Sequence, residues 1–130
     1  MTSPAGDLSG EWRGIFNYPR GQPPTEFTAT LHDAGGRLSG STVEPSLSGG
    51  TIVARIDGSH VGSAVSFMKL YDDDPEDQYD TVAYEGAVDA EGTEIAGRWS
   101  IPGVWSGSFI MVRRPGVEAG IEASVAEPVR

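Results

Sequence analysis

The residues of this sequence best suited to chemistry are aromatic and polar side chains that could hold a small, partly apolar molecule. Flat rings stack on such a molecule, while hydroxyl groups fix its orientation through directional hydrogen bonds. These side chains fall in or beside the irregular connections of the chain, so we expect them at one end of the fold. The predicted ligand-binding residues are Tyr18, Arg20, Thr42, Tyr71, Tyr79 and Trp105. Tyr84 and Trp99 fall deeper and are expected to fill the core.

No group of residues in the sequence is typical of catalysis. The two histidines, His32 and His60, fall beside expected tight turns, where we predict surface positions far from the ligand site. The segment Gly103-Val-Trp-Ser-Gly107 has its serine in the fourth position, so it is not the Gly-x-Ser-x-Gly turn of hydrolases. We therefore predict no catalytic residue, and a noncatalytic protein is favoured over an enzyme.

One acidic segment, residues 72–77, is the strongest candidate for a metal site. Carboxylates are the ligands that Ca²⁺ prefers, but the segment lacks the spacing and the glycine of an EF-hand loop. A solvated loop is therefore favoured over a Ca²⁺ site. The chain contains no cysteine, which excludes thiolate metal sites and disulfides. We predict no metal and no cofactor.

Short segments of alternating apolar and polar residues, separated by turn residues, run through most of the chain. This alternation is typical of β-strands with one buried face. No segment of helical length interrupts them, which argues against folds built from βαβ units. The pattern fixes the inward face of most strands but not that of the strand at 61–70. The expected strands are 11–18, 26–32, 37–44, 51–56, 61–70, 79–88, 93–101 and 104–114.

The first and last strands predict a closed barrel, because the alternation of residues 9–18 complements that of residues 105–113. The fold class is therefore all-β, an eight-stranded antiparallel up-and-down β-barrel of the lipocalin or avidin kind. Three tight turns, Asp33–Gly36, Asp57–His60 and Asp89–Gly92, share one end with the termini. The other connections are longer or rich in proline, so we expect an open mouth there, where barrels bind ligands.

The expected domain organisation is simple. Residues 1–8 form an N-terminal arm, with Leu8 under the barrel, and residues 9–114 form the β-barrel domain. Residues 115–130 form a C-terminal tail or a short helix, which is marginal by itself because it carries little apolar surface.

The composition of the chain limits its partners and its location. The 130 residues suit one domain, and the formal net charge of −10 argues against nucleic acids and anionic membranes as partners. The sequence shows no signal peptide and no apolar stretch long enough to span a membrane. We expect a cytoplasmic protein whose partner is a small hydrophobic ligand.

Gly10-Glu11-Trp12, with Arg113 near the end of the last strand, resembles the calycin pattern of lipocalins and avidins. The resemblance covers roughly residues 7–114. It implies that Trp12 plugs the closed end of the barrel and that the Arg113 guanidinium packs across the indole ring. Gly36–Thr42 also looks like the third avidin strand, but Thr42 stands where that family keeps a biotin-binding tyrosine. Biotin binding is therefore not expected.

The opening of the chain also looks like that of nitrobindins, which are ten-stranded haem barrels. Gly10-x-Trp12-x-Gly14, followed by Tyr18-Pro19, carries this resemblance. It implies a haem ligand from a histidine near the C-terminus, and no histidine follows His60. Haem binding is therefore not expected either.

These observations favour a noncatalytic barrel that binds a small hydrophobic or aromatic molecule. The alternative is a structural or interaction module that forms a homo-oligomer through apolar residues on the outside of the barrel. The outward-facing residues expected at such an interface are Ile15, Val53 and Val104. A barrel-type cyclase or isomerase comes third, since it would need Tyr18, Arg20 or Glu44 to converge on one point.

Overall fold

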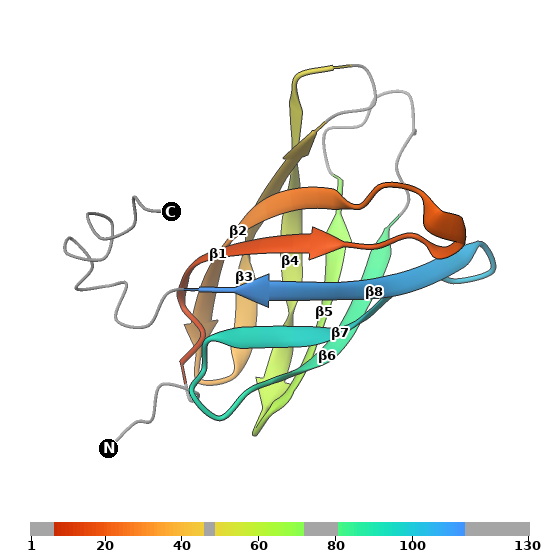
Figure 1. Ribbon diagram of the computed structural model, residues 1–130. Helices are drawn as coiled ribbons and strands as arrows, with labels where there is room; N and C mark the ends of the chain where they lie inside the picture. Colours follow the sequence, from red (N-terminus) through yellow and green to blue (C-terminus); the bar gives the residue numbers. More distant parts are fainter. Residues whose placement is uncertain (1–6, 46–48, 72–80, 114–130) are drawn as a thin grey trace, which may run out of the picture.

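The computed structural model describes residues 7–45, 49–71 and 81–113. Its eight strands pair in chain order and close into an antiparallel up-and-down barrel, so the predicted fold class is confirmed (Figure 1). The strands are β1 (Gly10–Phe16), β2 (Thr25–Ala34), β3 (Arg37–Pro45), β4 (Thr51–Val61), β5 (Ala64–Leu70), β6 (Val82–Val88), β7 (Glu94–Ile101) and β8 (Trp105–Val112). A short 3₁₀ turn, η2 (Pro19–Gly21), lies between β1 and β2. The predictions for Tyr79, for the acidic segment 72–77 and for the tail 115–130 lie outside the described residues.

The barrel closes through the predicted pairing of its first and last strands. Gly14 of β1 lies opposite Met111 of β8, and Phe16 lies opposite Phe109. Alternation then points the side chains of Trp12, Phe16 and Phe109 into the barrel, where each is buried. Closure leaves no free sheet edge, so the backbone groups of β1 and β8 that face each other are paired.

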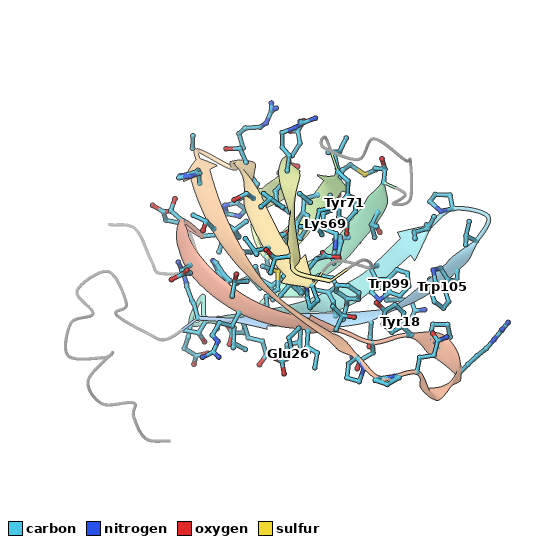
Figure 2. All side chains as sticks on the ribbon, turned by 90° about the horizontal axis from the view of Figure 1, so that it is seen from above. Tyr18, Glu26, Lys69, Tyr71, Trp99 and Trp105 are labelled. Atoms are coloured by element: carbon cyan, nitrogen blue, oxygen red, sulfur yellow. The ribbon has the colours of Figure 1, made fainter. Side chains whose placement is uncertain are left out.

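The barrel interior has an aliphatic part and an aromatic part. Near the termini it is filled mainly by aliphatic side chains around Trp12, and further along the axis by rings. Side chains in the first part that are at most 1 % exposed are Leu8, Leu31, Leu38, Ile56, Ile95 and Met111. Tyr18, Trp99 and Trp105 gather at the other part of the barrel, near the η2 turn (Figure 2).

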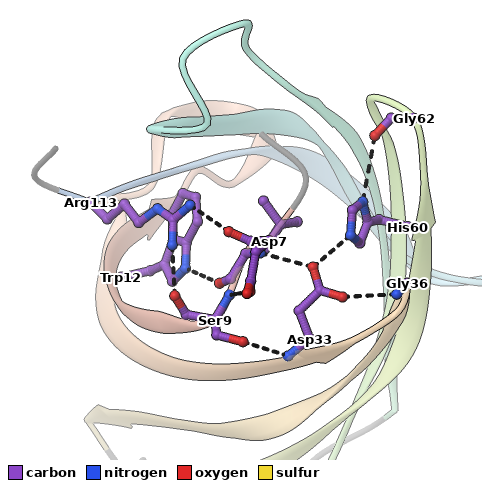
Figure 3. A network of polar contacts seen from close by, with 9 residues as sticks. Asp7, Ser9, Trp12, Asp33, Gly36, His60, Gly62 and Arg113 are labelled. Atoms are coloured by element: carbon purple, nitrogen blue, oxygen red, sulfur yellow. Dashed lines mark hydrogen bonds and ion pairs between the residues drawn. The ribbon is translucent and has the colours of Figure 1, made fainter. Parts of the chain in front are cut away.

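A polar network seals the end of the barrel where β1 begins and β8 ends (Figure 3). The Arg113 guanidinium lies 4.7 Å from the centre of a Trp12 ring, as the calycin resemblance implies. It also donates hydrogen bonds to the carbonyl oxygens of Asp7, Ser9 and Gly92. The Trp12 indole donates to the carbonyl of Leu8, whose side chain is fully buried as expected. This end of the barrel is therefore closed by packing and by charge-assisted hydrogen bonds.

The predicted turn at Asp57–His60 is wrong, because β4 continues through these residues to Val61. The β4–β5 turn lies instead at Gly62-Ser63, where Gly62 adopts a positive φ of 60°. Gly58 lies within β4, where the backbone comes very close to β5. A Cβ atom at Gly58 would lie 2.1 Å from the carbonyl oxygen of Ser66. A glycine in a strand can thus allow a close approach rather than a turn.

The prediction of a surface position for His60 is also wrong. The His60 side chain is only 7 % exposed, and its Nε2 atom lies 2.6 Å from Oδ2 of the buried Asp33 carboxylate (Figure 3). The same carboxylate accepts hydrogen bonds from the backbone N–H groups of Leu8 and Gly36. His60 therefore ties the β2–β3 turn to β4 at the closed end. His32 is exposed, as expected.

Candidate functional site

The most unusual side chain in the barrel is Lys69 on β5. Of the nine Lys and Arg residues in the chain, Lys69 is the one lysine. Val65, Phe67 and Lys69 share the inward face of β5, and Lys69 is only 2 % exposed. The Lys69 ammonium donates to Oε1 of Glu44 over 2.7 Å, and Glu44 is itself only 6 % exposed. The interior of the barrel therefore holds a buried ion pair.

Burial and the Glu44 carboxylate have opposite effects on the pKa of Lys69. Removing Lys69 from water lowers the pKa of its amine, and the neighbouring Glu44 carboxylate opposes that effect. The ion pair is short and isolated from solvent, so its attraction is screened far less than that of a surface pair. A buried amine whose pKa is lowered loses its proton more readily than a surface lysine.

Two further polar side chains accompany the ion pair. The Tyr71 hydroxyl donates to Oε2 of Glu44 over 2.9 Å, so both oxygens of this carboxylate accept a hydrogen bond. Burial, followed by the charge of Glu44, raises the pKa of Tyr71 and keeps the phenol neutral. Thr42 precedes Glu44 on the inward face of β3, and its buried Oγ1 has no hydrogen-bond partner among the described residues. An orphaned buried hydroxyl costs roughly 1–3 kcal/mol, which marks Thr42 as a group available to a ligand.

Aromatic rings surround the Lys69 ammonium. Its Nζ atom lies 4.6 Å from the ring centre of Phe16, 5.2 Å from Tyr71, 5.4 Å from Tyr84 and 5.9 Å from Phe27. The negative faces of such rings stabilise a cation where water is absent. Burial also raises the pKa of Tyr84 well above its usual value, so this ring stays neutral. These four rings therefore add to the stabilisation that the Glu44 carboxylate gives to a positive charge at Nζ.

A second group of rings lies toward the mouth of the barrel (Figure 2). The Tyr18 and Trp105 rings stack with their centres 5.2 Å apart, and Trp99 packs edge-on against both. Tyr18 exchanges a hydrogen bond with Thr25, and the Trp99 indole donates to the carbonyl of Asn17. Tyr18 and Trp105 are only partly buried. They therefore offer ring surface to a molecule arriving at this end.

Phe16 connects the two groups of rings. It lies edge-on to Tyr18 at 5.5 Å and to Trp99 at 6.1 Å, and it is also the ring closest to the Lys69 ammonium. Ring contacts through Phe16 therefore join the mouth aromatics to the surroundings of the buried ion pair.

A groove of about 320 Å³ opens in the wall of the barrel between β2 and β3. The pairing of these strands stops at Thr28 and Val43, and the strands separate beyond that point. Two of the residues that line the groove, Phe27 and Glu44, point into the barrel and are buried. Both lie against the Lys69 amine. The remaining residues of the lining are Arg13, Gly14, Glu26, Thr28, Val43, Pro45, Gly50 and Thr51.

A glycine on β1 allows Phe27 to lie where it does. A Cβ atom at Gly14 would lie 2.3 Å from the Phe27 ring, so any other residue would push this ring away. Phe27 therefore packs its ring against a backbone that carries no side chain.

The structure divides the predicted ligand-binding residues into three sets. Thr42 and Tyr71 lie with the buried ion pair, while Tyr18 and Trp105 lie with the mouth aromatics. Arg20 is exposed in the η2 turn, at a positive φ of 73°, and joins neither group. Tyr79 lies outside the described residues.

Sequence reasoning missed Lys69, Phe16 and Phe27 as members of the site. The sequence did contain a signal for Lys69. It is the one lysine of the chain, and it alternates with the apolar residues Val65 and Phe67, which indicates an inward position. Among the described residues, no group of three His, Cys, Asp or Glu side chains could hold a metal ion.

Comparisons with known proteins establish the fold but no family. No family model matches the sequence, and no curated protein matches it. Among solved structures, the chain is similar to a de novo designed fluorescence-activating β-barrel, with a TM-score of 0.60 and 13 % identity. The match covers 88 % of this chain and all of the designed chain. At this identity the similarity concerns the barrel fold alone. In the described part of the chain, no helix is long and apolar enough to cross a membrane.

Proposed function

We propose that this protein is a noncatalytic β-barrel that binds a small hydrophobic or aromatic molecule carrying a polar group. The observation that carries the proposal is the Glu44–Lys69 ion pair inside an aromatic interior. An apolar pair of similar volume would usually be as stable or more stable in such a place. The ion pair, together with the orphaned Thr42 hydroxyl, therefore argues for recognition of a polar group rather than for stability.

The expected ligand is compact and carries no net charge. The groove volume of about 320 Å³ falls at the lower end of the usual range for ligand pockets, roughly 300–1,000 Å³. Glu44 already balances the charge of Lys69, so an anion would be repelled by the carboxylate and a cation by the ammonium. Apolar contact would come from Phe16, Phe27 and the mouth aromatics, at about 25 cal/mol per Å² of apolar area buried.

The calycin pattern of Trp12 and Arg113 supports membership of the lipocalin and avidin type of barrel, which we include in the proposal. The solved neighbour is described as a fluorescence-activating β-barrel. A cytoplasmic location remains part of the proposal on the grounds given by the sequence.

One observation favours a second candidate function, a homo-oligomer formed through the outer wall. Val43 and Val53 are directly paired across β3 and β4, and they are 37 % and 55 % exposed. Such adjacent apolar residues suit contact with a second copy of the chain. The cyclase or isomerase hypothesis gains no such support, because Glu44 contacts Lys69 and Tyr71 while Arg20 is exposed.

Titration of tryptophan fluorescence with neutral aromatic molecules tests the proposed function. Cinnamyl alcohol is a suitable first probe. We expect it to change the emission, and Trp105→Ala to weaken binding by about tenfold or more, since buried aromatic contacts dominate small sites. His32→Ala, on an exposed residue, is the control and should leave binding unchanged. Equal affinity of the Trp105→Ala and wild-type proteins would refute the site. Light scattering that shows a dimer broken by Val53→Asp would favour the homo-oligomer.

A further inference from the structure

We propose that Lys69 captures an aldehyde ligand as a reversible imine, with Glu44 as the proton acceptor and counterion. This inference rests on the proposed function and adds to it the chemical class of the ligand. It starts from three features of the structure: one buried amine, one carboxylate 2.7 Å away, and a groove that reaches that carboxylate.

The pair of Lys69 and Glu44 is arranged to release the amine as a nucleophile. An ammonium cannot attack a carbonyl carbon, so the proton must first leave nitrogen. Glu44 Oε1 lies within hydrogen-bond reach of Nζ and can accept this proton. Transfer neutralises both groups, which lowers the cost of their burial. Desolvation, which lowers the pKa of Lys69, favours the same transfer.

The reaction balances without any oxidant or reductant. The Lys69 amine adds to the aldehyde carbon, forming a C–N bond while the carbonyl π electrons move to oxygen. Protons return through Glu44, the oxygen leaves as water, and a C=N bond remains. The protonated imine keeps the positive charge that Lys69 carried, so Glu44 remains its counterion. The product is one imine and one water for each amine and aldehyde consumed.

The surroundings of Nζ suit this product. The Tyr71 hydroxyl holds the second oxygen of Glu44, which fixes the carboxylate beside the nitrogen. The rings of Phe16, Tyr71 and Tyr84 face the position where the charge stays. A conjugated aldehyde would place its apolar tail in the groove, against the Phe27 ring. An anion is the other ligand class that lysines bind, but here it would lie beside the Glu44 carboxylate.

The groove between β2 and β3 is lined by two neighbours of the Lys69 amine. Phe27 and Glu44 line the groove from within, and Nζ lies against both. Lys69 itself does not line the groove and is only 2 % exposed, so we expect the Phe27 ring to move when an aldehyde reaches the nitrogen from this side. Glu26 also lines the groove, but it lies on the outward face of β2 and is exposed (Figure 2). The matched control carboxylate is therefore Glu85, which is exposed on β6 and lies outside the groove lining.

Reductive trapping with cinnamaldehyde and cyanoborohydride at neutral pH tests the inference on the whole chain. Reduction fixes an imine as an adduct with the mass of the aldehyde less one oxygen atom, and peptide mapping locates it. The α-amino group serves as an internal reference. An ordinary lysine has a pKa about 2.5 units above that of an α-amine, so at pH 7 it is labelled far more slowly. We expect Lys69 to be labelled at least as fast as the α-amine in the folded protein, and more slowly in urea.

Two variants connect the labelling to the structure. Glu44→Gln keeps the shape of the side chain but removes the proton acceptor, and should slow labelling of Lys69 by at least about tenfold, a modest effect for a proton-transfer group. Glu85→Gln, on an exposed residue of β6 outside the groove, should leave labelling unchanged. Circular dichroism establishes that both variants are folded. Adducts confined to the α-amine of the folded wild-type protein, or equal labelling of the two variants, would overturn the inference.

Cinnamyl alcohol distinguishes failure of the imine from failure of the binding site, because it has the same ring and chain but cannot form an imine. If the alcohol binds and no Lys69 adduct forms with the aldehyde, the imine is wrong and the binding barrel stands. If the alcohol competes with labelling of Lys69, both proposals are supported. If neither molecule binds or labels Lys69, both are wrong for this class of ligand.

Discussion

Replacing Lys69 by methionine should destabilise the barrel strongly, because it leaves Glu44 buried without a counterion. Lys69 and Glu44 are 2 % and 6 % exposed and are joined over 2.7 Å. Breaking a buried ion pair by removing one partner typically costs about 3–5 kcal/mol. The Tyr71 hydroxyl still donates to Glu44 in this variant, so we expect the lower half of that range.

The double variant Glu44→Leu with Lys69→Met should recover most of that loss. When two apolar side chains of similar volume replace a buried ion pair, the free energy of unfolding typically stays the same or rises by up to about 4 kcal/mol. Glu44→Leu alone should cost less than Lys69→Met, because the Lys69 amine can lose its proton and burial already lowers its pKa. Recovery of stability in the double variant would show that the barrel does not need the ion pair for its stability.

Urea unfolding followed by tryptophan fluorescence measures these free energies, provided that the slope with urea is unchanged among the variants. The matched control is Arg37→Met. Arg37 and Asp57 form an ion pair of 2.9 Å whose side chains are 69 % and 45 % exposed, so its loss should cost less than about 1 kcal/mol. Equal losses for Lys69→Met and Arg37→Met, or a double variant as unstable as Lys69→Met, would refute a buried ion pair at this position.

The remaining predictions concern the closed end and alkaline pH. Trp12→Ala should cost about 3–5 kcal/mol, because Trp12 is fully buried beneath the Arg113 guanidinium; a midpoint within error of wild type in urea would contradict this. Burial raises the pKa of Tyr71 and of Tyr84 above the unfolded value of about 10, so the folded state keeps protons that the unfolded state releases. Stability should therefore fall as the pH rises above about 10, whereas the lowered pKa of Lys69 makes stability rise with pH below that point. Phenolate absorbance should show these two tyrosines titrating only on unfolding; their titration in the folded barrel would contradict the expectation.

The barrel could be predicted from the sequence because its signals are local. Alternation fixed the inward positions of Trp12, Phe27 and Phe109, and the complementary ends of the chain predicted closure between β1 and β8. The β4–β5 turn was misplaced because Asp57-Gly58 has turn chemistry, while the close approach of Gly58 to β5 depends on a neighbouring strand.

The site was harder to predict because its decisive contact joins residues 25 positions apart in the chain. Lys69 breaks the alternation of β5, since a charged residue occupies an inward position, and this left the facing of residues 61–70 undecided. Glu44, which lies two strands away on β3 and accepts a hydrogen bond from Lys69, explains it. Tyr71 and Thr42 were both expected at the open end of the barrel, but nothing local indicates that Tyr71 donates to Glu44.

The most direct test of the binding proposal uses the single lysine of the chain as a reporter. Protein labelled with ¹³C at lysine Cε should give one lysine signal, because Lys69 is the one lysine present. Titration with cinnamyl alcohol, followed in parallel by tryptophan fluorescence, should shift this signal along the same binding curve, since the ligand would lie against the buried amine. A fluorescence titration that reaches saturation while the Lys69 signal stays unmoved would contradict a ligand site at the Glu44–Lys69 pair.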